Sequence, residues 1–434
     1  MNARDAYLVR PASAVHGTVT VPGDKSISHR ALMLGAIATG TTHVEGFLAG
    51  EDCLSTLAAL RALGVHIEQP AATQVLVHGV GHDGLKASAE PINMGNAGTA
   101  MRLFAGLLAG QRFDSTLIGD ASLMRRPMER VAAPLRLMGA SISTVEGHAP
   151  VRLRGGAGLH GIDYVLPVAS AQIKSAILLA GLHASGTTRI SESAPTRDHT
   201  ERMLGGFGAR VERQGSTISL AGGQTLRSCD VRVPGDFSSA AFFVVAGAIG
   251  ATAGLTIRNV GMNPTRTGLL ELLRRMGADI SIEPLPDYGA EPAANLTIRA
   301  APLRGIRVPP ELVSLAIDEF PAFFIAAAAA TGETVVTGAA ELRVKESDRL
   351  AVMAEGLSTL GIHCELQRDG LKIRGGPMRG GVVQSHDDHR IAMAFAIASL
   401  RASAPIRIEA VANVATSFPG FAATARQIGL DLVD

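Results

Sequence analysis

Leu60-Arg61-Ala62-Leu63-Gly64-Val65-His66-Ile67 has the pattern of an amphipathic helix end, a glycine, and the start of an alternating strand. A glycine just after a helix favours the left-handed conformation that ends it, and alternating apolar and polar residues are typical of a half-buried strand. The pattern recurs five more times, with glycines 68 to 84 residues apart. The six glycines are Gly64, Gly139, Gly208, Gly277, Gly361 and Gly429. Six occurrences at nearly constant spacing predict six α/β repeats.

A second duplication divides these repeats into two groups of three. Val21-Pro-Gly-Asp24 precedes a polar stretch that contains Lys25 and Arg30, and Val233-Pro-Gly-Asp236 repeats the turn and the hydroxyls that follow it. The second copy has Phe237 in the place of Lys25 and no matching Arg. We therefore expect one lobe at 21–234 and another at 1–20 with 235–434, joined by hinges near residues 22 and 234. A site between two such lobes is expected to close on its substrates and exclude water.

Composition narrows the class of protein. The 434 residues are too many for one ordinary core, and 47% are hydrophobic, as in a globular protein. The formal net charge of +1 gives no general attraction to nucleic acid or membranes, so any anion site must be local.

Cysteine usage and the apolar segments favour a cytoplasmic protein. Cys53, Cys229 and Cys364 are far apart and have no CxxC spacing, which indicates reduced structural thiols. The N-terminal segment lacks the pattern of a signal peptide. The apolar stretch 240–257 is predicted to be a buried helix, a Gly-rich turn and the start of a strand rather than a membrane span.

Charged and polar residues interrupt several runs of small apolar residues. Each such segment alone has an ordinary explanation: Ser170 as a helix cap, Asp318 or Glu319 as the cap of a core helix, and Glu346 with Arg349 as a surface ion pair. The segment 385–390, Ser-His-Asp-Asp-His-Arg, suggests a metal site, but its Arg and the lack of a partner His or Cys cluster argue against one.

Taken together, the cations suggest a binding site for small, highly charged anions. Arg binds carboxylate and phosphate with two parallel hydrogen bonds, and several Arg and Lys residues recur at predicted helix starts. Asp318 and Glu346 are the carboxylates placed to act as acid or base. The cations are Lys25, Arg30, Arg126, Arg197, Lys345, Arg349 and Arg390.

Four ordered motifs carry a family resemblance. Pro-Gly-Asp-Lys-Ser-Ile-Ser-His-Arg (22–30), Gly-Asn-Ala-Gly-Thr-Ala-Met-Arg (95–102), Arg-Val-Lys-Glu-Ser-Asp-Arg-Leu (343–350) and Asp-His-Arg-Ile-Ala-Met (388–393) together resemble the 5-enolpyruvylshikimate-3-phosphate synthase family of enolpyruvyl transferases. The resemblance spans essentially the whole chain. It implies a two-lobed inside-out α/β barrel of six βαβαββ repeats, three per lobe, with helices inside and sheets outside.

The resemblance also implies a reaction of the shikimate pathway. Phosphoenolpyruvate would donate its enolpyruvyl group to the 5-hydroxyl of shikimate 3-phosphate through a tetrahedral adduct that eliminates phosphate. We expect no metal or organic cofactor, and a monomer with these two small molecules as its partners.

Site residues follow from the resemblance position by position. It implies that Asp318 is the base for the 5-hydroxyl, that Glu346 is the acid for the methylene carbon, and that Lys25 is also catalytic. The shikimate 3-phosphate ligands would be Lys25, Ser26, Arg30, Ser170, Ala171, Gln172, Arg197, Asp318 and Lys345. The phosphoenolpyruvate ligands would be Lys25, Asn96, Gly98, Thr99, Arg126, Gln172, Arg349 and Arg390.

The chain departs from the best-known branch of the family near its C-terminus. That branch has a Lys before its Thr-Phe-Pro, where this chain has Thr416-Ser417-Phe418-Pro419, so one phosphoenolpyruvate contact is missing or supplied differently. The strings at 169–175, 196–201 and 263–268 instead resemble the second sequence class. Members of that class often tolerate glyphosate through an Ala at the position of Gly98, whereas this chain keeps Gly.

Two alternatives stay open. A UDP-N-acetylglucosamine enolpyruvyl transferase would use a cysteine on a mobile loop, and none of the three cysteines lies in a comparable motif. A non-catalytic protein that binds phosphorylated metabolites would not need both Asp318 and Glu346. A P-loop kinase is disfavoured because Pro-Gly-Asp-Lys-Ser lacks the first Gly and the loop length of GxxxxGK[ST].

Overall fold

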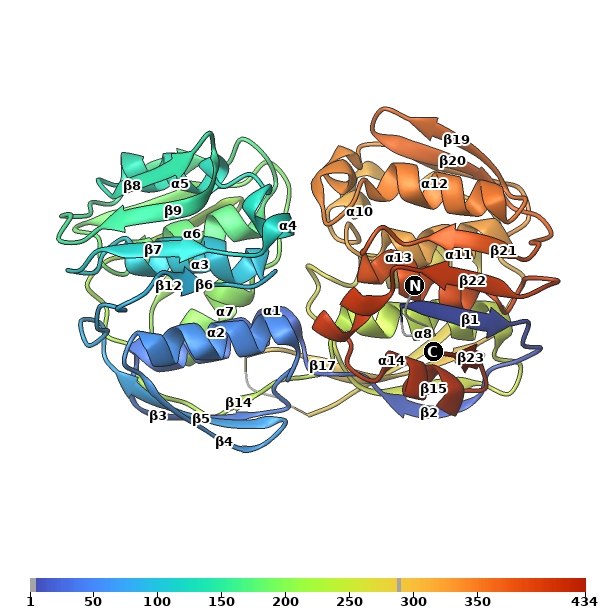
Figure 1. Cartoon of the computed structure of the whole chain (residues 1–434), viewed down its shortest axis with the longest axis horizontal. Helices are drawn as coiled ribbons and strands as arrows, with labels where there is room; N and C mark the ends of the chain where they lie inside the picture. The colour runs from blue at the N-terminus through green and yellow to red at the C-terminus, as the bar shows by residue number, and fades with distance from the viewer. Residues whose placement is uncertain (1–4, 287–289) are drawn as a thin grey trace. The chain divides into compact units, whose positions relative to one another are not determined.

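The computed structural model describes residues 5–286 and 290–434, and these form two compact units (Figure 1). Unit A is Gly23–Val233 together with the short segment that ends at Glu291. Unit B is the chain up to Pro22 and the part that begins at Pro234, apart from that segment. Glu291, which the predicted boundaries place in the other lobe, is held in unit A by His199, with 2.7 Å between Oε1 and Nδ1. Residues 1–4 of the predicted 1–20 segment lie outside the described residues.

Unit A contains three copies of one arrangement. Each copy consists of a strand, an inner helix, a parallel strand, an outer helix and an antiparallel hairpin of two strands. The four strands lie side by side in the order first, second, fourth, third. The first copy is β14 (Val231–Arg232), α1 (Lys25–Ile37), β3 (Thr39–Glu45), α2 (Glu51–Ala62), β4 (His66–Ala71) and β5 (Gln74–Val80). The second is β6 (Ile92–Asn93), α3 (Gly98–Leu108), β7 (Ser115–Ile118), α4 (Ala121–Met124), α5 (Glu129–Leu137), β8 (Ser141–Val145) and β9 (His148–Arg154). The third is β10 (Asp163–Val165), α6 (Ala171–Gly181), β11 (Thr187–Ser191), α7 (His199–Gly206), β12 (Val211–Gln214) and β13 (Thr217–Ala221).

Unit B contains three further copies. The first is β2 (Gly17–Thr20), α8 (Phe237–Gly250), β15 (Leu255–Gly261), α9 (Gly268–Met276), β16 (Asp279–Pro284) and β17 (Ala293–Arg299). The second is α10 (Pro310–Val313), α11 (Phe320–Ala329), β18 (Glu333–Val336), η1 (Ala340–Val344), α12 (Arg349–Thr359), β19 (His363–Gln367) and β20 (Gly370–Arg374), with isolated bridges from Arg304 and Arg307 in the place of a first strand. The third is β21 (Gly381–Gln384), α13 (His389–Ala398), β22 (Ile406–Glu409), η2 (Ala412–Thr416), α14 (Phe421–Gln427), β23 (Asp431–Val433) and β1 (Ala6–Arg10).

The six predicted helix-Gly-strand junctions are confirmed. All six glycines have positive φ, from +85° at Gly64 and Gly361 to +106° at Gly429. Each follows the last residues of an outer helix and precedes the third strand of its copy. The predicted six-repeat α/β fold is therefore confirmed.

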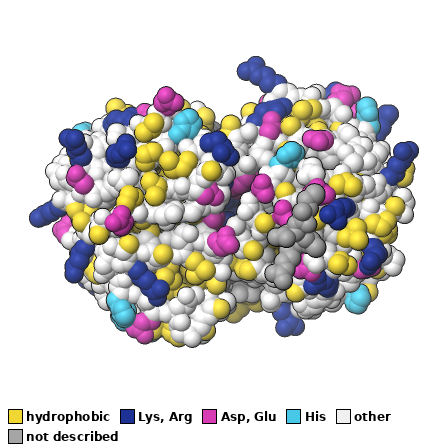
Figure 2. Space-filling model, in the orientation of Figure 1, with side chains coloured by type: hydrophobic (Ala, Val, Ile, Leu, Met, Phe, Trp, Pro, Cys, Tyr) yellow, Lys and Arg dark blue, Asp and Glu magenta, His cyan; other side chains and the backbone are white. Residues whose placement is uncertain are grey.

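The inner helices form the core of each unit. In unit B, α8 is buried along its whole length and packs with α11 and α13, while in unit A α3 packs on α6. The stretch 240–257 is the buried helix, turn and strand start that its composition predicts. Among the described residues, no helix has the length and apolar character that a bilayer crossing needs. Acidic and basic side chains are interspersed over the face in Figure 2, which agrees with the small net charge.

Candidate active site

The duplicated Pro-Gly-Asp turns have the same local structure. Asp24 caps α1 by accepting from the Ile27 amide at 2.9 Å, and Asp236 caps α8 by accepting from the Ser238 amide at 2.9 Å. The φ and ψ angles of the two aspartates agree within a few degrees. The next residue differs, because α1 begins with Lys25 and α8 with the buried Phe237. The turn therefore serves the fold in both units, and only the unit A copy presents a cation.

Arg30 is a buried cation whose hydrogen-bond acceptors are uncharged. Its guanidinium donates to Thr200 Oγ1 at 2.7 Å, to Ser175 Oγ at 2.8 Å and to the Ser26 carbonyl at 2.9 Å. Burial lowers the pKa of Arg30 to about 10; the negative charges of Glu201, Asp24 and Glu291 oppose this shift, and the positive charge of Arg197 adds to it. The hydrogen-bond acceptors of this buried cation are neutral and the nearby carboxylates do not offset its burial, so an anionic ligand would stabilise it.

Lys25 begins α1 and is paired with a carboxylate from the next helix. Its Nζ lies 2.8 Å from Asp52 Oδ2, and about a fifth of the side chain is exposed. The pair is thus open to solvent on one side, and an incoming anion has access to the ammonium.

Asn96 and Arg126 are held together at the start of α3. Arg126 donates to Asn96 Oδ1 at 2.6 Å, and Asn96 donates to Asp120 Oδ2 at 2.7 Å. Asp120 also caps α4 through the Leu123 amide. Gly98 is the first residue of α3, and a β-carbon built there would lie 3.0 Å from Arg126 Nη1. Glycine therefore makes room for the guanidinium.

Gln172 is oriented by two neighbours on α3. Its Nε2 donates to Thr99 Oγ1 at 3.0 Å, and its Oε1 accepts from Arg102 Nη1 at 2.7 Å. Arg102 is buried and also donates to the Pro127 carbonyl at 3.2 Å. The sequence interpretation missed Arg102 as a site residue, although it is the last letter of the 95–102 motif.

The loop that carries Arg197 is tied to α6 by a buried lysine. Lys174 Nζ lies 3.1 Å from Glu192 Oε2, 2.7 Å from Glu201 Oε1 and 3.4 Å from the Thr196 carbonyl. Ser170 caps α6 by accepting from the Ile173 amide, as predicted, and Ala171 is its first helical residue. Lys174 lies within the 169–175 string, but its burial could not be seen in the sequence.

These contacts define the unit A cluster. Its members lie at or beside the first turns of α1, α3, α6 and α7, except Arg126, which follows α4 and reaches Asn96 with its side chain. α6 carries both Ser175, which contacts Arg30, and Gln172, which contacts Thr99. The cluster consists of Lys25, Ser26, Arg30, Asn96, Gly98, Thr99, Arg126, Ser170, Ala171, Gln172 and Arg197.

In unit B, Arg349 is the centre of a second cluster and is 1% exposed. Its guanidinium pairs with Asp388 at 2.8 Å, Glu346 at 2.5 Å and Asp318 at 3.3 Å. Burial alone lowers the pKa of Arg349, but the negative charges of the three carboxylates, that of Asp388 first, outweigh burial and raise it. Arg349 therefore stays protonated and fixes the carboxylates around it.

Lys345 and Arg390 complete this unit B cluster. Lys345 Nζ lies 3.5 Å from Asp318 Oδ1, and Arg390 Nη1 donates to the Asp318 carbonyl at 3.2 Å. Asp388 caps α13 through the Arg390 amide, so the aspartate of the apparent metal motif is engaged in capping and in the Arg349 ion pair. The unit B cluster is Asp318, Lys345, Glu346, Arg349, Asp388 and Arg390.

Two of the ordinary explanations are wrong. Arg349 is buried, so its pair with Glu346 is not a surface ion pair. Neither Asp318 nor Glu319 caps α11 with its side chain, although Glu319 occupies the N-cap position. Glu319 instead accepts from the Ser238 hydroxyl, and Arg266 bonds Ser238 Oγ at 2.6 Å and Asp236 at 3.0 Å. The Glu319 carboxylate is thus engaged by a buried hydroxyl of α8 and does not accept from the amides at the start of α11.

The Thr416 side chain bonds to the backbone of the turn that contains it. Its hydroxyl donates to the Asn413 carbonyl at 2.7 Å, and the side chain is buried. Thr416 therefore supplies no charge in the place of the Lys found in the other branch.

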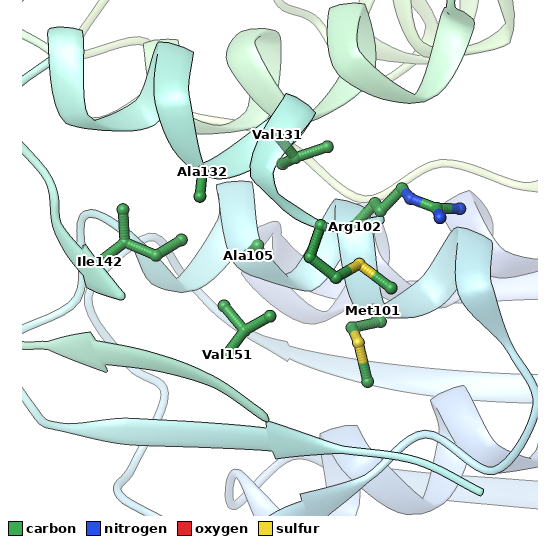
Figure 3. Close-up of a pocket in the computed structure, with 8 residues that line it drawn as sticks. Met101, Arg102, Ala105, Val131, Ala132, Ile142 and Val151 are labelled. Carbon is green, nitrogen blue, oxygen red and sulfur yellow. The ribbon is translucent and has the colours of Figure 1, made fainter. Parts of the chain in front are cut away.

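A small pocket beside the unit A cluster is a packing gap. It lies among α3, α5, β8 and β9, and Figure 3 shows apolar side chains such as Ile142 and Val151 around it. The Arg102 guanidinium in Figure 3 is turned away from this lining. An apolar lining does not suit phosphorylated ligands.

Comparison with known proteins assigns the family. The family model of EPSP synthase (3-phosphoshikimate 1-carboxyvinyltransferase) matches residues 9–424. The 3-phosphoshikimate 1-carboxyvinyltransferase of Methylococcus capsulatus is 59% identical over 98% of both chains, and that of Halorhodospira halophila is 61% identical over 98% of this chain and 96% of the relative. The EPSP synthase structure from Acinetobacter baumannii is 54% identical, with a TM-score of 0.90 over 99% of this chain and 100% of that one. The chain belongs to the EPSP synthase (3-phosphoshikimate 1-carboxyvinyltransferase) family.

Proposed function

We propose that the unit A and unit B clusters are the machinery with which this enzyme transfers the enolpyruvyl group of phosphoenolpyruvate to the 5-hydroxyl of shikimate 3-phosphate, releasing phosphate. The observation that carries the proposal is the position of the cations. Lys25 and Arg349 are the first residues of α1 and α12, and Arg390 is the second residue of α13. A cation at a helix N-terminus opposes the helix dipole, whereas an anion bound there is favoured by it. Both substrates are anions that compensate this arrangement.

In unit A, the proposed work is binding and orientation. Lys25, Ser26, Arg30, Ser170, Ala171, Gln172 and Arg197 bind shikimate 3-phosphate. Arg126, with Asn96, Gly98, Thr99, Lys25 and Gln172, binds phosphoenolpyruvate. The hydrogen bonds Arg126–Asn96 and Gln172–Thr99 support these roles because they hold both side chains before a ligand arrives.

In unit B, the proposed work is proton transfer and charge compensation. Asp318, with Lys345 beside it, takes the proton of the 5-hydroxyl as that oxygen adds to C2 of phosphoenolpyruvate. Glu346 gives a proton to C3 in the same addition, which yields the tetrahedral adduct. Glu346 then takes a proton back from C3 as the C–O bond to phosphate breaks, the proton held by Asp318 passes to the departing phosphate, and the enol ether forms. Arg349 and Arg390 bind the carboxylate and phosphate of phosphoenolpyruvate.

The cysteines disfavour the related UDP-N-acetylglucosamine transferase. Burial raises the pKa of Cys229 to about 11 and that of Cys364 to about 12, so neither thiol is activated. Cys53 is fully buried and its Sγ lies 3.8 Å from the Lys25 carbonyl. An activated nucleophilic cysteine has a lowered pKa and is accessible.

The test is phosphate release with each substrate alone and with both together. The proposal requires release only when phosphoenolpyruvate and shikimate 3-phosphate are both present, and none when UDP-N-acetylglucosamine replaces the shikimate. Tight binding of both substrates without phosphate release would identify a non-catalytic binding protein.

We further propose a cytoplasmic monomer with hinges at the Pro-Gly turns near residues 22 and 234. The three free cysteines support a reducing compartment, and the chain passes between the units beside both turns. We propose no nucleic-acid or membrane partner. Sedimentation equilibrium across a range of protein concentrations tests the monomer.

A further inference from the structure

Two imidazoles and a carboxylate form a group on the outer face of the first sheet of unit A. His66 and Glu68 lie on β4 and His78 on β5, and His66 pairs directly with His78 in the antiparallel register. Residues two apart on a strand share a face, so Glu68 projects to the same side as His66. One potential ligand atom from each of the three side chains lies within 4.8 Å of the other two. None of the three belongs to the unit A cluster.

We propose that His66, Glu68 and His78 form a surface site for a divalent transition-metal ion such as Zn²⁺. Zinc binds His nitrogen at about 2.0–2.1 Å and carboxylate oxygen at about 2.0–2.2 Å, which places neighbouring tetrahedral ligand atoms about 3.3 Å apart. Glu68 Oε1 is 2.7 Å from His78 Nε2 and 3.6 Å from His66 Nε2. These two separations lie on either side of the required value, and the two imidazole ligand atoms lie within 4.8 Å of each other, so both rings have to turn toward a common ion.

A hydroxyl on the next strand helps to orient one imidazole. Thr41 on β3 pairs with His78, and its Oγ1 lies 3.2 Å from His78 Nδ1. When Nδ1–H donates to Thr41, the lone pair of Nε2 is directed to the side where Glu68 lies. Histidines that bind metals commonly have such an outer partner on the second nitrogen.

The three side chains are exposed, so an ion can reach them from solvent without displacing other parts of the protein. The exposed fractions are 72% for the His66 side chain, 48% for Glu68 and 38% for His78, so the rings can reorient and water can fill the remaining metal positions. The His66 and His78 rings are stacked with centroids 4.8 Å apart. Imidazole donors select Zn²⁺, Cu²⁺ or Ni²⁺ over Mg²⁺ and Ca²⁺.

The bound ion would brace an irregular hairpin. The β4–β5 register shifts between Glu68 and Ala71, so the ladder is interrupted next to the site. A metal that joins the two strands stabilises the folded state, since it binds that state and not the unfolded chain.

Calorimetry of the full, untagged chain with ZnCl₂ tests the proposal. We expect one ion per chain, and affinity at least ten- to a hundred-fold weaker in His66→Ala and His78→Ala, since loss of an outer partner alone costs about that much. His43→Ala is the matched control, because His43 is exposed on the same face, opposite Leu76, and outside the group. Affinity should fall as the pH drops, because imidazole must lose its proton to bind metal.

Thermal unfolding gives the second readout. Zn²⁺ should raise the Tm of the parent chain and of His43→Ala, but not that of His66→Ala or His78→Ala. Equal binding by all four chains, loss in His43→Ala as well, or no binding by the parent would overturn the site. Phosphate release by the His66 and His78 variants should match the parent, which separates this proposal from the proposed function.

Discussion

Gly98→Ala places a methyl group against the guanidinium proposed to bind phosphoenolpyruvate. The new β-carbon would lie 3.0 Å from Arg126 Nη1, 3.2 Å from Arg102 Nη1 and 3.4 Å from Leu123 Cδ1. Carbon and nitrogen atoms pack without strain at about 3.5–4.0 Å, so the methyl displaces Arg126 by a few tenths of an ångström or more. Glyphosate is a phosphonate dianion similar in size to phosphoenolpyruvate but longer by one or two bonds, and we expect it to compete for the same site.

The expected cost follows from overpacking, which costs on the order of 1–3 kcal/mol. Phosphoenolpyruvate is affected only through the shifted Arg126, so we expect the lower cost of about 1 kcal/mol. This cost corresponds to a rise of about fivefold in the KM for phosphoenolpyruvate. Glyphosate is longer and also contacts the new methyl group, so we expect the upper cost of about 3 kcal/mol. This cost corresponds to a rise of about 150-fold in the inhibition constant of glyphosate. The ratio of the two changes is therefore the informative quantity.

The assay is phosphate release against phosphoenolpyruvate concentration at several glyphosate concentrations, for the parent chain and the variant. Gly205→Ala is the matched control, since it lies in α7 and a β-carbon there meets no described atom within 4 Å. Equal changes in KM and inhibition constant would refute the assignment of Gly98 to the inhibitor's position. A parent enzyme indifferent to millimolar glyphosate would show that Gly98 does not decide tolerance in this chain.

Four further results are expected. Glu346→Gln should lower kcat by roughly 10²–10⁴ with little change in substrate binding by calorimetry, and a near-parental rate would reduce Glu346 to an ion pair. Arg126→Ala should weaken phosphoenolpyruvate by about 1.5–3 kcal/mol and shikimate 3-phosphate much less, and equal losses in calorimetry would contradict its role. Shikimate 3-phosphate should reduce the radius of gyration in small-angle scattering, and an unchanged value would count against hinges at the Pro-Gly turns. Burial lowers the pKa of His29 to about 3, so below about 6.5 the unfolded chain binds a proton that the folded chain does not. The free energy of unfolding should therefore fall progressively from about pH 6.5 toward pH 3. Measured by urea unfolding at several pH values, it should depend less steeply on pH in His29→Gln than in the parent chain.

Local features of the fold were predictable because their causes are local. A glycine with positive φ ends a helix through its own backbone, so Gly64 and its five equivalents could be recognised one by one. Asp24 and Asp236 cap the helices that start next to them, and the duplicated turn shows this directly. The short first strands could not be seen, since Val231–Arg232 has too few residues to show any periodicity.

Contacts between distant residues were not predictable from one sequence. Arg102 and Gln172 are 70 residues apart, and they meet because α3 packs on α6. Glu319 has the position and chemistry of a helix cap, but Ser238, 81 residues away, takes its carboxylate. The resemblance to a known family therefore supplied the site residues, and spacing alone supplied only their candidate status.

The sheets of unit A and those of unit B are completed at different times during synthesis, because their strands have partners at different distances along the chain. Every sheet of unit A is completed by Val233, because β14 returns to pair with β3 at the start of the unit. β1 has to wait much longer, since its neighbours β22 and β23 are among the last residues made; in Figure 1 this blue strand lies between two red ones. A growing chain therefore carries all three sheets of unit A while the N-terminal strand is still unpaired, and only the short segment that ends at Glu291 joins unit A later. Domains that are complete early fold as units during translation, so Gly23–Val233 should become protease-resistant on the ribosome before most of unit B has been made.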